Sequence, residues 1–173
     1  MLAQRQRDLE RCVTDSSPEA RLAAAGFTLP EVSSPRGSYA PYCAIQVGTS
    51  QWVSIAGQVC RRNGVAMAGQ CRGDDDLELA RHAAEVSVLN ALAILRLACD
   101  GELSRVVQIV RLRGFIRAAP DFTRHAAVLD AASAVMRAAF PGQPLPARSA
   151  LGVASLPDRA WTEIEVDAIV MTA

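Results

Sequence analysis

The stretch Pro146-Ala-Arg-Ser-Ala-Leu-Gly-Val-Ala-Ser-Leu-Pro157 combines a short β-strand pattern with a single cation, Arg148. Proline cannot donate a backbone hydrogen bond to a sheet, so the prolines at both ends limit the predicted strand to residues 148–155. A second strand pattern at residues 161–171 carries Glu163, Glu165 and Asp167 at alternate positions. An arginine on one strand and carboxylates on the next predict a site for a small charged molecule. The alternative is a structural salt bridge from Arg148 to Glu163 or Glu165.

Outward from this stretch, the chain alternates between strand and helix patterns. A helix start at Ser16 or Ser17, followed by Pro18, predicts a first short helix that stops at Gly26. The order after it is strand, strand, helix, strand, helix, strand, strand, which predicts an α+β sandwich with two helices on one face of a mixed sheet. The first five of these seven elements are expected at residues 42–47, 52–59, 77–99, 106–117 and 121–139.

Three local patterns refine this prediction. Gly57, near the end of the second strand, indicates a β-bulge more than a ligand contact. Asp74-Asp75-Asp76 before a helix favours an N-terminal cap over a carboxylate cluster for a metal. Strict alternation in the strand at 106–117 places Gln108, Val110 and Leu112 on one face, and Ile109 with Arg111, Arg113 and Phe115 on the other. The open face of the sheet is expected to carry Arg111, Arg113 and Glu163, and to meet other subunits.

The charge composition excludes several classes of chemistry. The 173 residues have a formal net charge of zero, so we expect neither nucleic acid nor an anionic membrane as a partner. All 18 basic residues are arginine, which excludes a lysine Schiff base with pyridoxal phosphate and the lysine of a P-loop. Any carboxylate anchor in this chain must therefore be an arginine or a group of backbone N–H donors.

The cysteines and the chain start give further expectations. Five cysteines without C-x-x-C spacing indicate reduced thiols rather than a zinc site, although Cys60 and Cys71 are the nearest pair to one. No metal and no cofactor is expected. The chain lacks a membrane-length apolar run and a signal-peptide core, so we predict a cytoplasmic protein. Residues 1–18 are expected to form a flexible tail, and residues 19–173 a single domain.

Several of these motifs together resemble the RidA/YjgF family of imine/enamine deaminases, in a longer, less characterised branch. The most specific are the stretch at 146–157 and Glu163-Ile-Glu that follows it. Weaker ones are Ala25-Gly-Phe-Thr-Leu-Pro, Tyr39-Ala-Pro-Tyr, Ala56-Gly-Gln, Asn90-Ala-Leu, Val110-Arg-Leu-Arg-Gly-Phe-Ile and Asp121-Phe.

The resemblance implies a chorismate-mutase-like fold, a homotrimer and sites in the clefts between subunits. It implies that Arg148 binds the carboxylate of a 2-imino or 2-enamino acid and that Glu163 positions or activates the attacking water. The products would be a 2-keto acid and ammonia. The residues expected around the substrate are Tyr42, Ala56, Gly57, Phe115, Asp130 and Ala150.

The chain departs from the family pattern at three of these positions. Ala56 replaces a serine and Ala150 replaces a frequent cysteine, while Asp130 is the nearest candidate for a family asparagine. An aspartate in the pocket would repel a carboxylate, so the substrate preference is expected to differ. Two alternatives to general deamination stay open. The first is a non-catalytic trimer that binds small carboxylates or regulates a partner protein. The second is a deaminase dedicated to one enamine in a degradative pathway.

Overall fold

The structure, a computed structural model, describes residues 17–32 and 34–172. The predicted tail lies almost wholly outside these residues and stays a prediction. Five strands form one sheet in the order β1-β2-β7-β5-β6, in which β5 and β6 are parallel and the other neighbours are antiparallel. The sheet is therefore mixed, as predicted. Its strands are β1 (Tyr42–Val47), β2 (Ser50–Val59), β5 (Val106–Arg117), β6 (Ala147–Val153) and β7 (Thr162–Met171).

The strand order corrects one expectation that bears on the site. Arg148 and Glu163 were predicted on neighbouring strands, but β5 lies between β6 and β7. A parallel pair needs a crossover connection, and helix α4 (His125–Ala139) supplies it between β5 and β6. The last strand then pairs antiparallel with both β5 and β2 at the centre of the sheet.

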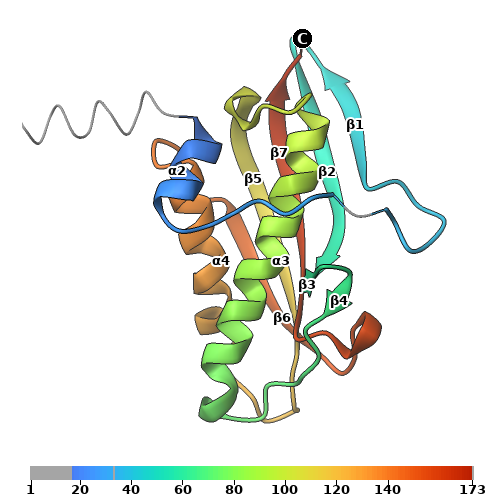
Figure 1. The fold of residues 1–173 in the computed structure, drawn as a ribbon, viewed down its shortest axis with the longest axis vertical. Helices are drawn as coiled ribbons and strands as arrows, with labels where there is room; N and C mark the ends of the chain where they lie inside the picture. The colour runs from blue at the N-terminus through green and yellow to red at the C-terminus, as the bar shows by residue number, and fades with distance from the viewer. Residues whose placement is uncertain (1–16, 33, 173) are drawn as a thin grey trace, which may run out of the picture.

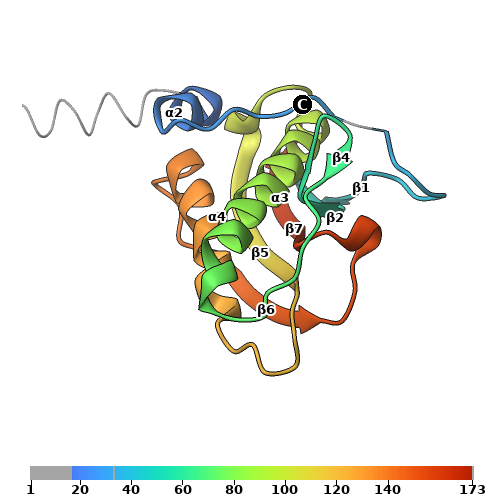
Figure 2. The same ribbon diagram turned by 60° about the horizontal axis from the view of Figure 1, so that its bottom comes forward.

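Two long helices cover one face of the sheet, as the sequence predicted. Helix α3 (Leu77–Ala98) packs on β2 and β7, and α4 packs on β6, while no helix of residues 17–32 and 34–172 covers the opposite face of the sheet (Figures 1 and 2). The strands alternate accordingly: in β7, Ile164, Val166 and Ala168 are buried toward the helices, and Glu163 and Glu165 face the open side. The core thus lies between the sheet and the two helices.

Strand β5 departs from the strict alternation predicted for it. Ile109 is 2% exposed and belongs to the core together with Leu112, whereas Gln108 and Val110 are only half-buried. The β5–β7 register shifts between Val106 and Gln108 and again between Ile109 and Arg111. Each irregularity resets which face a side chain occupies, so the predicted faces of residues 108–110 were wrong.

The helix ends follow local chemistry. Ser17 accepts a hydrogen bond from the Ala20 N–H and caps helix α2 (Pro18–Ala24), as predicted. The three aspartates form a 3₁₀ turn before α3, and no side-chain cap bond comes from Asp76. Helix α4 begins four residues later than the predicted Asp121, because residues 119–122 form a turn that buries Phe122. A small antiparallel hairpin follows β2. It consists of β3 (Arg61–Arg62) and β4 (Val65–Ala66), which are joined by a two-residue turn at Asn63 and Gly64.

Candidate functional site

Gly57 lies in a β-bulge near the C-terminal end of β2, beyond the part of β2 that pairs with β1. The β2–β7 register runs to Ile55 opposite Val166 and resumes at Gln58 opposite Ile164, so Ala56 and Gly57 are the irregular residues. Strand β1 ends its pairing with β2 at Tyr42, and the Ala56 N–H bonds instead to the carbonyl of Pro41 at 3.0 Å. The bulge predicted at Gly57 is thereby confirmed.

The Glu163 carboxyl group occupies the space that a side chain at residue 57 would need. A Cβ built on Gly57 would lie 1.9 Å from Oε1 of Glu163 and 2.9 Å from its Cδ. Glycine is therefore required here for the close approach of a carboxyl group to the backbone, and not for an unusual φ angle. The bulge and the glutamate form one structural unit.

Burial raises the pKa of Glu163, and the nearby charge of Glu165 raises it further. Glu165 and Asp167 share Arg113, whose Nη1 and Nη2 donate to them at 2.8 Å each. Among the described residues, by contrast, Glu163 has no hydrogen bond or ion pair. Glu163 therefore holds its proton more strongly than an ordinary glutamate does.

A cavity of about 770 Å³ adjoins this carboxyl group. Ala56, Gly57 and Glu163 line it from the sheet, and the Asn90 side chain closes it from α3 by donating to the carbonyls of Val59 (3.0 Å) and Arg61 (3.1 Å). Its size suits a small organic molecule with room to spare.

The outer wall of the cavity comes from distant segments of the chain. Tyr39 and Arg36 line it from the loop before β1, and Asp158 lines it from the turn before β7. Asp158 accepts hydrogen bonds from both Arg36 and Arg61, and Arg36 also donates to the Gly64 carbonyl at 2.7 Å. Sequence reasoning missed these residues as parts of a site. Tyr39 and Asn90 belonged to motifs of the family resemblance, but Arg36, Arg61 and Asp158 carried no local signal.

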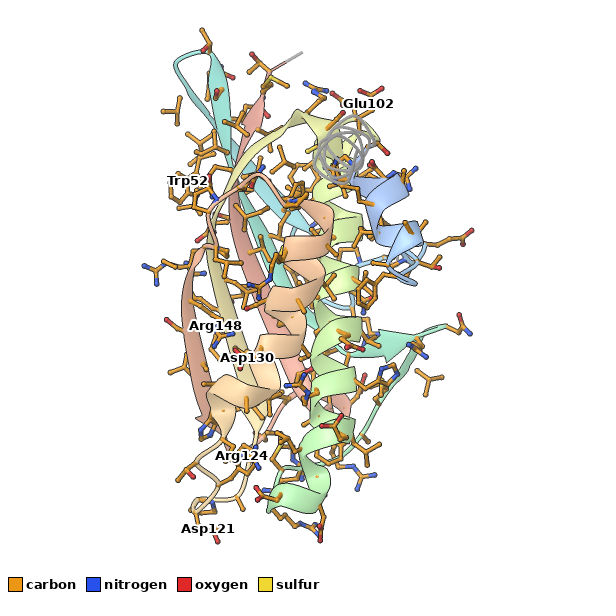
Figure 3. All side chains as sticks on the ribbon, turned by 90° about the vertical axis from the view of Figure 1, so that its left-hand side faces the viewer. Trp52, Glu102, Asp121, Arg124, Asp130 and Arg148 are labelled. Atoms are coloured by element: carbon orange, nitrogen blue, oxygen red, sulfur yellow. The ribbon has the colours of Figure 1, made fainter. Side chains whose placement is uncertain are left out.

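Arg148 lies in a different environment, between β6 and α4. Its Nη1 donates to Oδ1 of Asp130 and to Oγ of Ser133, both at 2.9 Å, and its Nη2 makes a longer bond of 3.4 Å to the Ala126 carbonyl. All three acceptors belong to α4, and Figure 3 shows Arg148 and Asp130 side by side. The predicted alternative, an ion pair with Glu163 or Glu165, is not what Arg148 forms.

A single chain does not bring Arg148 and Glu163 together. In the register, Arg148 stands opposite Leu112, whose side chain is in the core, whereas Glu163 stands opposite Phe115 on the open face. The two predicted catalytic groups therefore occupy opposite faces of the sheet, with β5 between their strands.

Some of the remaining predicted residues lie near Glu163, and others lie on or beside the strand of Arg148. Phe115 is the cross-strand neighbour of Glu163. Ala150 lies on β6 opposite Gly114 and packs against the core. Tyr42 pairs with Ile55, packs against the core and borders a shallower hollow that shares Ala40, Ala56 and Glu165 with the main cavity. Tyr39, three residues before it, is the tyrosine that lines the cavity of Glu163.

Cys71 and Cys99 are poorly suited to a chemical role. Cys71 and Cys99 are buried, which raises the pKa of Cys71 to about 12 and that of Cys99 to about 11. Such thiols stay protonated at neutral pH and make poor nucleophiles and metal ligands. Within residues 17–32 and 34–172, no three His, Cys, Asp or Glu side chains gather as a metal site would require. The same residues include no helix long and apolar enough to cross a membrane.

Comparison with known proteins gives consistent results. A family described as "YjgF/chorismate_mutase-like, putative endoribonuclease" matches residues 19–151. Protein TCP17 of Trypanosoma cruzi is 31% identical over 154 residues, which cover 87% of this chain and 91% of that protein. A protein with unknown function from Agrobacterium tumefaciens has a similar structure, with a TM-score of 0.75, 32% identity and coverage of 90% and 92% of the two chains. A structure from Shewanella oneidensis, titled "putative endoribonuclease", gives a TM-score of 0.79 and 32% identity, and covers 88% of this chain and 99% of that one.

Proposed function

The chain belongs to the YjgF/chorismate-mutase-like family, and from this premise we propose that it hydrolyses 2-imino acids and their enamine tautomers to 2-keto acids and ammonia. The observation that carries the proposal is the Glu163 carboxyl group. It is half-buried against Gly57, has a raised pKa and no partner among the described residues, and faces a cavity large enough for such a substrate. A carboxyl group tuned in this way suits general acid–base chemistry on water.

The reaction needs one water molecule and no redox partner. The Glu163 carboxylate accepts a proton from water while the oxygen attacks the electrophilic carbon of the protonated imine, which forms a carbinolamine. The carbinolamine nitrogen is then protonated, and the C–N bond breaks while the hydroxyl group gives its proton to solvent, so that the C=O bond forms and ammonia leaves. Glu163 returns the proton it took, so the carboxylate is regenerated. Most of the catalysis would come from orienting the water and the substrate.

In this proposal the substrate carboxylate is bound by Arg148 of a second copy of the chain. One chain holds Arg148 and Glu163 on opposite faces, so a complete site needs two copies, and we propose a homotrimer. Exposed apolar side chains on the helix-free face support such an association. Trp52 points away from the helices (Figure 3), and Ile45, Leu151 and Met171 accompany it on the same face.

RNA cleavage, which the family description and the name of the Shewanella oneidensis protein suggest, is a less suitable function for this chain. The formal net charge is zero, and the candidate cavity combines three carboxylates with two arginines that already pair with Asp158, so it offers no net positive charge to a phosphate backbone. A non-catalytic carboxylate-binding trimer is the stronger alternative. It is favoured by the acceptors that already surround Arg148 and by the absence of a hydroxyl at Ala56.

The test is an assay in which an amino-acid oxidase generates imino acids in situ while imine loss is followed. We expect the wild type to accelerate the loss, and Arg148→Ala and Glu163→Gln to reduce the acceleration by about 100-fold or more. Arg137→Ala, which removes an exposed arginine of α4, is the control and should leave the rate unchanged.

Two outcomes would contradict the proposal. If the wild type accelerates the loss of no imino acid, the deaminase function is wrong, and keto-acid binding without turnover would favour the carboxylate-binding alternative. If sedimentation gives a stable monomer, the shared site between copies is wrong.

A further inference from the structure

The ion pair between Arg148 and Asp130 changes what the proposed carboxylate anchor can bind. The Arg148 side chain is 24% exposed and that of Asp130 60% exposed, so the aspartate lies at the solvent side of the pair. Both bonds from Nη1 go to α4, to Asp130 and Ser133. Nε has no acceptor among the described residues, and Nη2 has only the long bond to Ala126. One planar edge of the guanidinium group, formed by Nε and Nη2, is therefore the part that can take a ligand carboxylate.

We propose that Asp130 makes this anchor selective for acids that carry a positively charged nitrogen beside the carboxylate, and selective against 2-keto acids, which carry only the negative charge. The inference rests on the proposed role of Arg148 as the carboxylate anchor. It names the charge state of the preferred ligand, a zwitterion such as a 2-iminio acid.

The argument is one of net charge. Arg148 and Asp130 together are neutral, so a plain carboxylate that binds to Arg148 brings an uncompensated negative charge close to Asp130. A zwitterion brings a positive charge as well, which offsets the repulsion. Since Nε and Nη2 point away from Nη1, Asp130 acts on the ligand across the guanidinium group rather than by direct contact. One unit charge about 6–7 Å away, in surroundings between protein and water, changes affinity by about threefold to tenfold.

This selectivity would reduce product inhibition in the proposed reaction. The substrate in its protonated form is a zwitterion, whereas the product is an anion. Asp130 would thus weaken product binding while it leaves substrate binding nearly unchanged, and product inhibition by 2-keto acids would be weak.

The experiment measures the binding of two probes, pyruvate and alanine, by calorimetry. They share a carbon skeleton and a carboxylate and differ in the charged nitrogen. The full-length wild type is compared with Asp130→Asn, which keeps the shape and removes the charge. Asp121→Asn is the matched control, because it removes an exposed carboxylate just before α4 that has no contact with Arg148. Thermal melting confirms that each variant is folded.

We expect Asp130→Asn to tighten pyruvate binding about threefold to tenfold and to change alanine binding by less than about twofold, with no change in Asp121→Asn. Asp130→Ala removes the hydrogen-bonding group as well as the charge. It should shift the ratio of the two affinities in the same direction, because both variants lack the charge. A merely structural role for Asp130 would weaken both probes equally.

The outcomes distinguish the inference from the proposed function. An unchanged ratio of affinities, or an equal loss for both probes, overturns the inference alone. If neither probe binds to the wild type, the carboxylate role of Arg148 is wrong and the inference falls with it. If the ratio shifts as expected but imine loss is not accelerated, the selectivity is supported and the deaminase function is wrong.

Discussion

The two charged groups proposed to carry the chemistry are held in contrasting ways. Glu163 is placed by packing alone: its carboxyl group fills the gap left by a glycine in a β-bulge and has no partner among the described residues. Arg148 is fixed by polar contacts, with three acceptors on one helix. Packing leaves a charge free to gain or lose a proton, whereas a set of polar partners holds it in one state and one orientation. The first arrangement suits proton transfer and the second suits binding.

The largest effect on activity is expected when a side chain at residue 57 fills the space that the Glu163 carboxyl group occupies. In Gly57→Ala the new methyl group would displace the end of the Glu163 side chain, which is flexible, so the fold should survive. We expect imine hydrolysis to fall about 100-fold, as displacements of about 1 Å in catalytic groups can cause. The oxidase-coupled assay measures the rate, and calorimetric melting measures the stability.

Gly114→Ala is the matched comparison, because this glycine also faces a close neighbour. Its Cβ would lie 2.3 Å from Cδ1 of Leu129, which is buried in the core on α4. Overpacking a core costs about 1–3 kcal/mol of unfolding free energy, so this variant should lose stability where Gly57→Ala loses activity. If Gly57→Ala instead unfolds the protein, the idea that packing at residue 57 serves the carboxylate is wrong.

A smaller effect should follow from removing one partner of Arg148. Ser133→Ala deletes an acceptor of Nη1 and leaves the Asp130 ion pair in place. The loss of about 1 kcal/mol from one hydrogen bond predicts carboxylate binding weakened by about fivefold, with the same factor for pyruvate and alanine. Titration calorimetry checks this result. A change confined to one of the two ligands would assign Ser133 a direct part in selectivity.

The smallest effect concerns stability and pH. Burial raises the pKa of Glu163 in the folded protein above its ordinary value of 4.5, so the unfolded chain loses that proton at a lower pH than the folded one. Ionisation therefore favours unfolding as pH rises through this window, and the penalty persists above it. Glu163→Gln should melt about 1–2 °C higher than the wild type at pH 8.

The same comparison should show no difference near pH 3, where the carboxyl group is protonated in both states. Melting curves across this pH range measure it. A wild type more stable than Glu163→Gln at pH 8 would mean that the carboxylate has a favourable partner in the assembled protein.

Much of the fold could be predicted from the sequence, because the helices and strands follow from local residue patterns. Period-two and helical spacing located the main strands and helices, and a glycine late in a strand located the bulge at Gly57. The faces of residues 108–110 could not be predicted, since the register of β5 shifts twice against β7. The strand order could not be predicted either. Nothing in the stretch at 146–157, which contains β6, indicates that it pairs with β5 rather than with β7.

The candidate site was predictable only in part for the same reason. Glu163 and Gly57 were identified from motifs, and the structure places them in contact. That Arg148 turns to α4 depends on the parallel pairing of β6, which sequence alternation alone does not specify. The outer wall of the cavity, with Arg36 and Asp158, is assembled by contacts between distant segments that carry no local pattern.

The ion pairs at that outer wall join segments that are far apart in the chain. Arg36 meets Asp158 across 122 positions of the chain, and Arg61 meets it across 97. Contacts of such long sequence separation require the closure of long loops, which costs conformational entropy. On the ribosome, the loop before β1 emerges long before Asp158 is synthesised, so the cavity closes only when the chain is nearly complete. A copy shortened before Asp158 lacks this wall as well as β7.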